Sequence, residues 1–174
     1  NFAEFARALE LPGAKSLPVK PETIDALADS LEGQVNLTPN WISATVYQRV
    51  ANKLATEAIE DQRLDFEDGY GARANEEEDG HAISAAMELA GGVKENLLPP
   101  FIGIRIKSLT EETKRRSIRT LDLFLSTFAD QGVSLPDPFF ITLPKVTSPE
   151  QVRALLTCVE LLEERCAFPE GHIK

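Results

Sequence analysis

Apolar residues in this chain follow two patterns, which alternate from residue 62 onward. Three short apolar runs, within 62–68, 101–107 and 139–144, are predicted to be buried strands. Each is followed by a segment whose apolar residues recur every three or four positions, as on one face of a helix. A strand–helix order repeated three times with short connections predicts parallel strands joined by right-handed crossovers. The expected fold class is therefore α/β.

The predicted helices carry recognisable boundaries. The first has Ile83 on its apolar face and is expected to stop at Gly91-Gly92, and the second is expected to end at Gly132. The third opens with a capping box, from Ser148 to Gln151, that has proline at the first helical position. After it, residues 172–174 resemble the approach to a further strand.

The first part of the chain has a different pattern. Its apolar residues show helical periodicity only, and no strand is predicted there. Residues 1–33 predict two short helices, 34–40 show no periodicity, and a longer helix is expected over 42–59. The expected organisation is an N-terminal helical segment, 1–40, followed by a domain of (β/α) units, 41–174.

Composition narrows the function classes. A formal charge of −10 argues against a nucleic-acid partner, since such binding depends on clustered lysine and arginine. The sequence contains no apolar stretch of membrane-spanning length, so no membrane partner is expected. The two cysteines, Cys158 and Cys166, form no metal-binding or disulfide pattern. A reducing, cytoplasmic location fits these features best.

Two charged clusters have simple interpretations as parts of helices. The acidic run from Asn75 to Asp79 lacks the ligand spacing of a calcium loop and suits the first turn of a helix. The basic cluster of Lys114, Arg115, Arg116 and Arg119 is predicted to be the solvated face of an amphipathic helix.

Charged residues gather at the carboxyl end of each predicted strand. They are Asp65, Glu67 and Asp68 in the first, Arg105 and Lys107 in the second, and Lys145 after the third. Parallel strands bring their carboxyl ends to one edge of the sheet, so we expect these side chains to converge there. Function is therefore sought at this edge.

Each member of this set has two interpretations. The three acids need a cation, an arginine or a shared proton, which suggests either a divalent metal or a solvated loop with a turn at Asp68-Gly69. Arg105 lies between two isoleucines and needs an anionic partner, either an internal carboxylate or a substrate carboxylate or phosphate. Lys107 and Lys145 could serve the substrate or form salt bridges with Asp65 or Glu67.

Three of these segments together resemble a known family. The segments 64–69 (LDFEDG), 104–108 (IRIKS) and 143–150 (LPKVTSPE) are similar to three successive signatures of the HpcH/HpaI aldolase and citrate lyase β-subunit family. The match covers roughly residues 60–165. The resemblance implies a TIM barrel of the phosphoenolpyruvate/pyruvate type, of which this chain would hold only part. It also implies Mg²⁺ and cleavage or formation of a carbon–carbon bond through an enolate.

The resemblance assigns roles residue by residue. Arg105 would grip a substrate carboxylate or carbonyl oxygen, while Asp65 and Lys145 would complete the catalytic pocket. Glu67 and Asp68 would hold water ligands of the metal, whose direct ligands are expected beyond Lys174. Lys107 departs from the family pattern, which usually has asparagine there, and is assigned to substrate binding beside Arg105.

The expected partners follow from that chemistry, and rival functions remain. The substrate would be a small carboxylate, such as a 2-oxo acid, or an acyl-CoA thioester, and a homo-oligomer is expected. A non-catalytic subunit that binds a metabolite or serves a structural role is the main alternative. A small flavodoxin-like phosphate-binding domain ranks last, because a carboxylate cluster occupies the first turn where a phosphate cradle would be needed.

Overall fold

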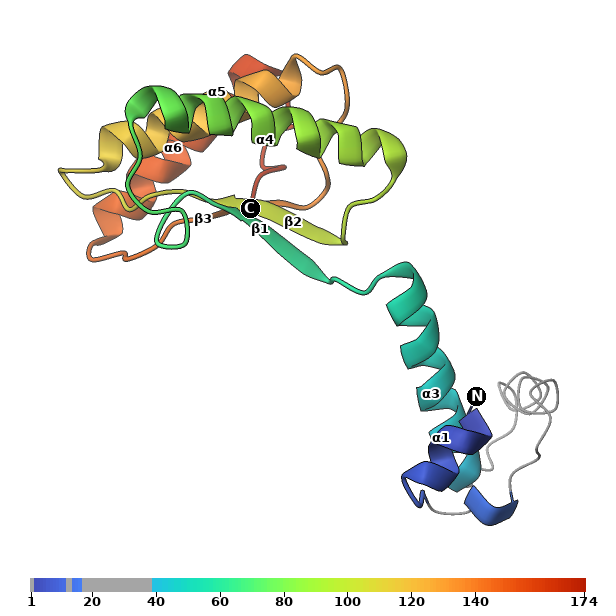
Figure 1. Ribbon diagram of the computed structural model, residues 1–174. Helices are drawn as coiled ribbons and strands as arrows, with labels where there is room; N and C mark the ends of the chain where they lie inside the picture. Colours follow the sequence, from blue (N-terminus) through green and yellow to red (C-terminus); the bar gives the residue numbers. More distant parts are fainter. Residues whose placement is uncertain (1, 12–13, 17–38) are drawn as a thin grey trace. The chain divides into compact units, whose positions relative to one another are not determined.

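The computed structural model describes residues 2–11, 14–16 and 39–174, and the chain forms two compact units (Figure 1). The units are 1–58 and 59–174. The second predicted N-terminal helix lies outside the described residues. The division differs from the expected boundary at 40/41, because the long helix that ends near residue 56 belongs to the first unit.

The described residues of the first unit form helical elements. They are α1 (Phe2–Ala8), the 3₁₀ turn η1 (Ala14–Ser16) and α3 (Pro39–Thr56). The rings of Phe5 and Tyr47 lie 5.2 Å apart, which joins α1 to α3. Apolar side chains on α3, at Val46, Val50 and Leu54, line a groove of about 550 Å³ together with Phe5 of α1 and two leucines that follow α1.

The second unit alternates strands and helices in the predicted order. Its elements are β1 (Asp61–Asp65), α4 (Asn75–Glu95), β2 (Phe101–Arg105), α5 (Lys114–Ala129), β3 (Phe139–Thr142) and α6 (Pro149–Cys166). The strands form a parallel sheet in the order β1-β2-β3. The prediction of an α/β fold with parallel strands is confirmed. Within the described part of the chain the sheet is open and has three strands.

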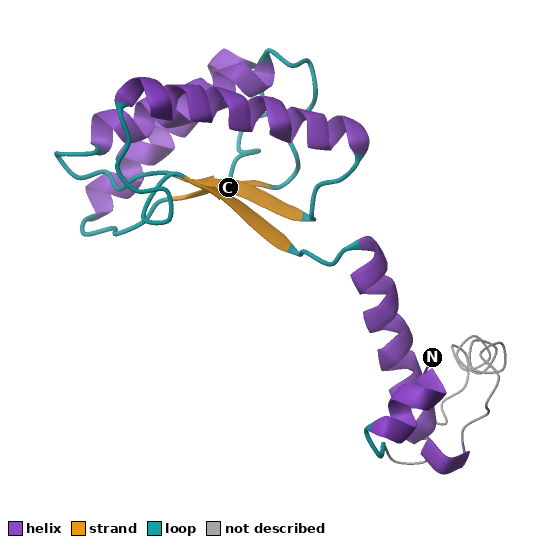
Figure 2. Cartoon of the chain, viewed as in Figure 1, coloured by secondary structure: helices purple, strands orange, loops and turns teal. Residues whose placement is uncertain are grey.

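The three helices cover one face of this sheet (Figure 2). Residues that pair across parallel strands share a face, and the register aligns Leu64, Ile104 and Ile141. Ile104 is fully buried, and it packs in one core with Phe124 and other side chains of α5. Burial of this continuous apolar layer is the main source of stability for the unit.

Strand order also bears on the class of α/β fold. In the flavodoxin-like arrangement the order of strands reverses at a switch point. Here the strands follow one another in sequence, and their connecting helices all lie on the same side (Figure 1). Successive (β/α) units of a barrel have this arrangement, and so does one half of a doubly wound sheet.

The opposite face of the sheet carries polar and aromatic side chains. Arg63 on β1 stands over the ring of Phe140, 4.7 Å from its centroid, and Phe101 is exposed beside it. Gly103 lies between Arg63 and Phe140 in the register of the three strands. A Cβ atom at Gly103 would lie 2.2 Å from the carbonyl oxygen of Phe140, so only glycine permits β2 and β3 to approach here.

Helix boundaries agree with the sequence in part. The capping box at Ser148 and Gln151 is present, with proline in the first turn of α6. By contrast, α4 does not stop at Gly91-Gly92 but continues to Glu95 and ends with Asn96 in the left-handed region. Gly92 instead makes room for Leu98, whose Cδ2 atom would be 2.6 Å from an added Cβ.

The last residues of the chain run beside β3, as the sequence suggested. Ile173 pairs with Phe139 in parallel, and the backbone N–H of Lys174 donates to the carbonyl of Phe139 at 2.8 Å. The buried carboxylate of Glu163 accepts hydrogen bonds from the backbone of Gly171 and Ile173 at 2.8 and 2.7 Å, which fixes the preceding turn.

Candidate functional site

Asp65 and Arg105 form the centre of the candidate site. They are register partners at the carboxyl ends of β1 and β2. The guanidinium donates from Nε to Asp65 Oδ1 at 2.8 Å and from Nη2 to Oδ2 at 2.6 Å, a two-point ion pair. The same carboxylate accepts the backbone N–H groups of Glu67 and Gly69 at 2.9 and 3.0 Å, so both oxygens are doubly occupied.

These contacts explain the electrostatics of the pair. The hydrogen bond from Arg105 is the main reason that the pKa of Asp65 falls from 3.8 to about 2; the backbone N–H groups add to this effect, and partial burial opposes it. The pKa of Arg105 is raised, chiefly by the same hydrogen bond. Both groups are therefore charged throughout the physiological range.

The way Asp65 holds Arg105 leaves part of the guanidinium open. Asp65 occupies the side formed by Nε and Nη2, and no described residue accepts a hydrogen bond from Nη1. The Arg105 side chain is 36% exposed. A guanidinium has five N–H donors, so the Nη1–Nη2 fork can still receive a second carboxylate or a carbonyl oxygen.

Lys145 joins the two remaining acids of the edge. Its ammonium lies 2.5 Å from Glu67 Oε1 and 2.7 Å from Asp68 Oδ1. The hydrogen bond from Lys145 lowers the pKa of Asp68, and the bond to Asp68 raises the pKa of Lys145. Lys145 has a φ of 52°, the left-handed region that a non-glycine residue seldom adopts. The chain thus turns sharply where it presents this ammonium to the acids.

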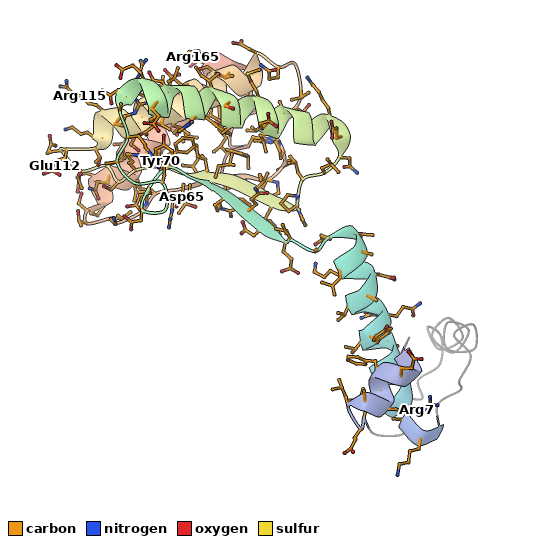
Figure 3. All side chains as sticks on the ribbon, viewed as in Figure 1. Arg7, Asp65, Tyr70, Glu112, Arg115 and Arg165 are labelled. Carbon is orange, nitrogen blue, oxygen red and sulfur yellow. The ribbon has the colours of Figure 1, made fainter. Side chains whose placement is uncertain are left out.

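The structure therefore brings Asp65, Glu67, Asp68, Arg105 and Lys145 to one edge, as the parallel topology predicted (Figure 3 labels Asp65). It also provides the internal partners that sequence reasoning had kept as an alternative, because each cation here is paired with a carboxylate. The two ion pairs are neighbours, since the charges of Glu67 and Asp68 contribute to the raised pKa of Arg105.

Lys107 lies elsewhere than expected. Its ammonium is 2.9 Å from Glu78 Oε2 on α4 and donates to the carbonyl oxygen of Phe66 at 2.7 Å. The side chain is only 14% exposed. This placement does not match the prediction that Lys107 stands beside Arg105 to bind substrate. In an extended strand, side chains two positions apart, such as those of Arg105 and Lys107, lie on the same face. Because β2 ends at Arg105, this alternation of faces does not extend to Lys107.

The acidic run does lie in the first turn of α4, as predicted. The charged clusters of α4 and α5 meet each other, so the prediction that the basic cluster is only solvated surface is wrong. The Glu78 side chain is 1% exposed, and its Oε1 atom lies 3.4 Å from Nε of Arg116. The carboxylate of Asp79 forms ion pairs with Nη2 of Arg116 at 2.5 Å and with Nη2 of Arg119 at 2.6 Å. Arg115 does remain on the surface, as Figure 3 shows. Sequence spacing places each cluster correctly on its helix but contains no signal that the two helices face each other.

A direct Mg²⁺ site does not fit the residues that the structure describes. No group of three carboxylate, histidine or cysteine side chains suited to a metal occurs among them. Asp65 has both oxygens occupied, and Glu67 and Asp68 share Lys145. Asp68 is largely exposed, however, so carboxylate oxygens at this edge can contact the water shell of an ion.

A wide groove of the second unit lies away from this edge. It has a volume of about 1010 Å³ between α5 and α6, and its lining includes Lys114, Ile118 and Gln151 but none of the five convergent residues. Its surface mixes both signs of charge with apolar patches. We therefore locate the candidate site by the convergence of charge and not by the size of the cavity.

Comparison with known proteins assigns the chain to a family without a known role. An α/β unit with a charged carboxyl edge is a scaffold shared by many enzymes and binding proteins. A family model described as "Domain of unknown function (DUF6986)" matches residues 1–174, so the chain belongs to that family. No curated protein and no solved structure matches it. None of the helices in the described ranges has the length and apolar character to cross a bilayer.

The Asp65–Arg105 pair gives a prediction for pH dependence. We expect Asp65→Asn to lower the free energy of unfolding at pH 7 by about 1–3 kcal/mol, because a charge-assisted pair and two backbone hydrogen bonds are weakened. The folded-state pKa is depressed from 3.8 to about 2, so the carboxylate stabilises the fold above pH 4 and loses this effect as the pH falls towards 2. Denaturant unfolding at several pH values should therefore show the two proteins converging in acid. A constant difference down to pH 2 would contradict the assignment.

Proposed function

We propose that the carboxyl edge of β1–β3 is part of the active site of a carbon–carbon lyase or aldolase. The substrate would be a 2-oxo acid or an acyl-CoA thioester, and the reaction would pass through an enolate. The observation that carries this proposal is the state of Arg105, which Asp65 fixes from one side while its outer fork stays open. A fixed guanidinium with free donors suits a ligand that has a carboxylate or develops an enolate oxygen.

The topology supports a (β/α) barrel as the framework for this site. Sequential parallel strands with helices on one face are units of such a barrel, and active sites of barrels lie at the carboxyl ends of the strands. The polar face that carries Arg63 and Arg105 would then line the interior. This part of the proposal extends beyond the three strands that the described residues form.

In the proposed reaction each residue of the edge has a limited task. Arg105 would orient the substrate carboxylate and stabilise the negative charge that grows on the enolate oxygen. Asp65 would hold the guanidinium at a fixed angle and keep it charged. Lys145 would set the positions of Glu67 and Asp68, and its ammonium would add positive potential at the same edge.

Mg²⁺ belongs to the proposal in a restricted way. Glu67 and Asp68 would hold water molecules of the ion, and carboxylates other than those described would have to bind it directly. When bound, such an ion polarises a carbonyl group and so makes the neighbouring carbon–hydrogen or carbon–carbon bond easier to break.

Enolate formation can be tested without knowing the full substrate. The full-length protein, with Mg²⁺, should catalyse exchange of the methyl protons of pyruvate or acetyl-CoA for deuterium in D₂O, which proton NMR follows directly. We expect exchange well above the buffer rate for at least one of the two compounds. Absence of exchange with both, in a folded protein that still binds them, would contradict an enolate mechanism.

One observation favours a second candidate function, a non-catalytic subunit that binds a metabolite. Every carboxylate of the described edge already holds a cation, so none stands ready as a general base. A binding subunit would take up a carboxylate at Arg105 without chemistry. Calorimetric binding of pyruvate combined with no proton exchange is the result expected for that function.

A further inference from the structure

A buried ion pair lies behind the candidate site and joins three elements of the second unit. Glu78, near the start of α4, accepts Thr120 Oγ1 of α5 at 2.7 Å and lies 2.9 Å from Lys107 Nζ. Glu78 is 1% exposed, so its charge requires compensation inside the protein. Lys107 and Arg116 provide that compensation.

Lys107 is also tied to the segment that carries two of the site acids. Its ammonium donates to the carbonyl oxygen of Phe66, the residue just before Glu67 and Asp68. It stands 4.9 Å from the centroid of the Tyr70 ring, in the same segment. Its own carbonyl accepts the buried hydroxyl of Ser117 at 2.6 Å, so the lysine is fixed at both ends.

We propose that the Lys107–Glu78 pair positions the loop from Phe66 to Gly71, and with it the acids of the site. Lys107 is then a positioning residue that does not contact substrate. An ammonium group can donate in three directions, so it meets a carboxylate and a carbonyl together while it faces an aromatic ring. This inference rests on the proposed function for its catalytic consequence, but its structural part can be measured separately.

The alternative is that Lys107 only neutralises Glu78. A single change, Lys107→Met, cannot separate these roles, because it takes one partner from a buried charge pair, which is strongly destabilising in itself. The double variant Lys107→Met with Glu78→Gln removes both charges and restores neutrality. In that protein the Phe66 carbonyl has still lost the hydrogen bond from Lys107. The loop should therefore open more often than in the wild type, even though no unpaired Glu78 charge is left in the core.

The loop has a reporter of its own. The N–H of Gly71 donates to the carbonyl of Glu67 at 2.9 Å, and its hydrogen exchange measures how often the loop opens. We expect the double variant to exchange this proton at least about tenfold faster than the wild type, with amides inside α5 unchanged. Arg119→Met is the matched control, because Arg119 belongs to the same charged network but, among the described residues, its hydrogen bonds and ion pairs go only to Asp79 and none reaches the loop.

Activity gives a second and independent readout in the pyruvate exchange assay. If the inference holds, the double variant lowers kcat at least about tenfold with KM changed less than twofold, since Arg105 keeps its place on β2. Wild-type values for both the Gly71 exchange and kcat would overturn the inference. Faster Gly71 exchange in a protein whose wild type shows no pyruvate or acetyl-CoA exchange would support the positioning role and overturn only the proposed function.

Discussion

Replacing Arg105 with alanine is expected to reduce enolate exchange in the full-length protein by about 10²–10³-fold, because an oriented donor to a developing oxyanion typically contributes that much. Arg105→Lys should recover only a small part of this loss. Lysine keeps the positive charge, but it cannot bind Asp65 at two points and offer a fork to the substrate at the same time. Steady-state rates of deuterium incorporation into pyruvate, for the three proteins, measure the effect.

Arg63→Ala is the matched control for this experiment. Arg63 is an arginine on the same face of the sheet, but it pairs with Asp61 and stands over Phe140, away from the carboxyl edge. We expect its removal to leave kcat within about twofold, since it has no partner at the site. Equal losses in Arg63→Ala and Arg105→Ala would indicate a general effect of charge on the face. Unchanged turnover in Arg105→Ala would remove Arg105 from the mechanism.

Gly103→Ala is expected to destabilise the second unit by about 3 kcal/mol or more, because an added methyl group overpacks a site with no room to relax. The new Cβ would lie 2.2 Å from a backbone oxygen of Phe140, and backbone cannot move aside as a flexible side chain can. The strand pairing of β2 and β3 would have to open. Chemical denaturation followed by circular dichroism measures this loss.

Gly80→Ala provides the opposite expectation in the same domain. Gly80 lies inside α4, and an added Cβ there meets nothing within 4 Å. Alanine should therefore raise the free energy of unfolding by about 0.5–1 kcal/mol through its better helix propensity. If both glycine variants destabilised the protein equally, the close approach at Gly103 could not be the cause of the first effect.

Pattern alone was sufficient for much of the fold. The three strands, the helix after each and the parallel order all follow from the alternation of short apolar runs with helical stripes, because each pattern can bury its apolar side in only one way. The convergence of Asp65, Arg105 and Lys145 follows from the same topology. The features that follow from parallel strand order, including the position of the charged edge, could therefore be predicted from the sequence.

The sequence could not predict which charge finds which partner. Lys107 has the spacing to share a face of the sheet with Arg105. Because β2 ends at Arg105, however, Lys107 lies outside the strand and forms its ion pair with Glu78. Arg116 and Asp79 form a contact between two helices that local periodicity treats as separate solvated surfaces. Such pairings depend on the distance and rotation between elements, and these are set by core packing.

Helix length shows a similar limit. Two glycines, as at 91–92, are a common signal for the end of a helix, but α4 continues through them. The close packing of Leu98 leaves no room for a side chain at Gly92. Tertiary contact therefore overrode a local preference. The boundary between the two units was also placed too early, since α3 contacts α1, and a stripe on a helix does not identify the element that covers it.

The most direct test of the central claim is a crystal structure of the full-length protein grown with oxalate, a small dicarboxylate that resembles an enolised 2-oxo acid. We expect one carboxylate of oxalate on the Nη1–Nη2 fork of Arg105, with Nε still bonded to Asp65. Oxalate bound elsewhere, or an Arg105 that must release Asp65 to reach it, would contradict a site built on a guanidinium held ready at the end of β2.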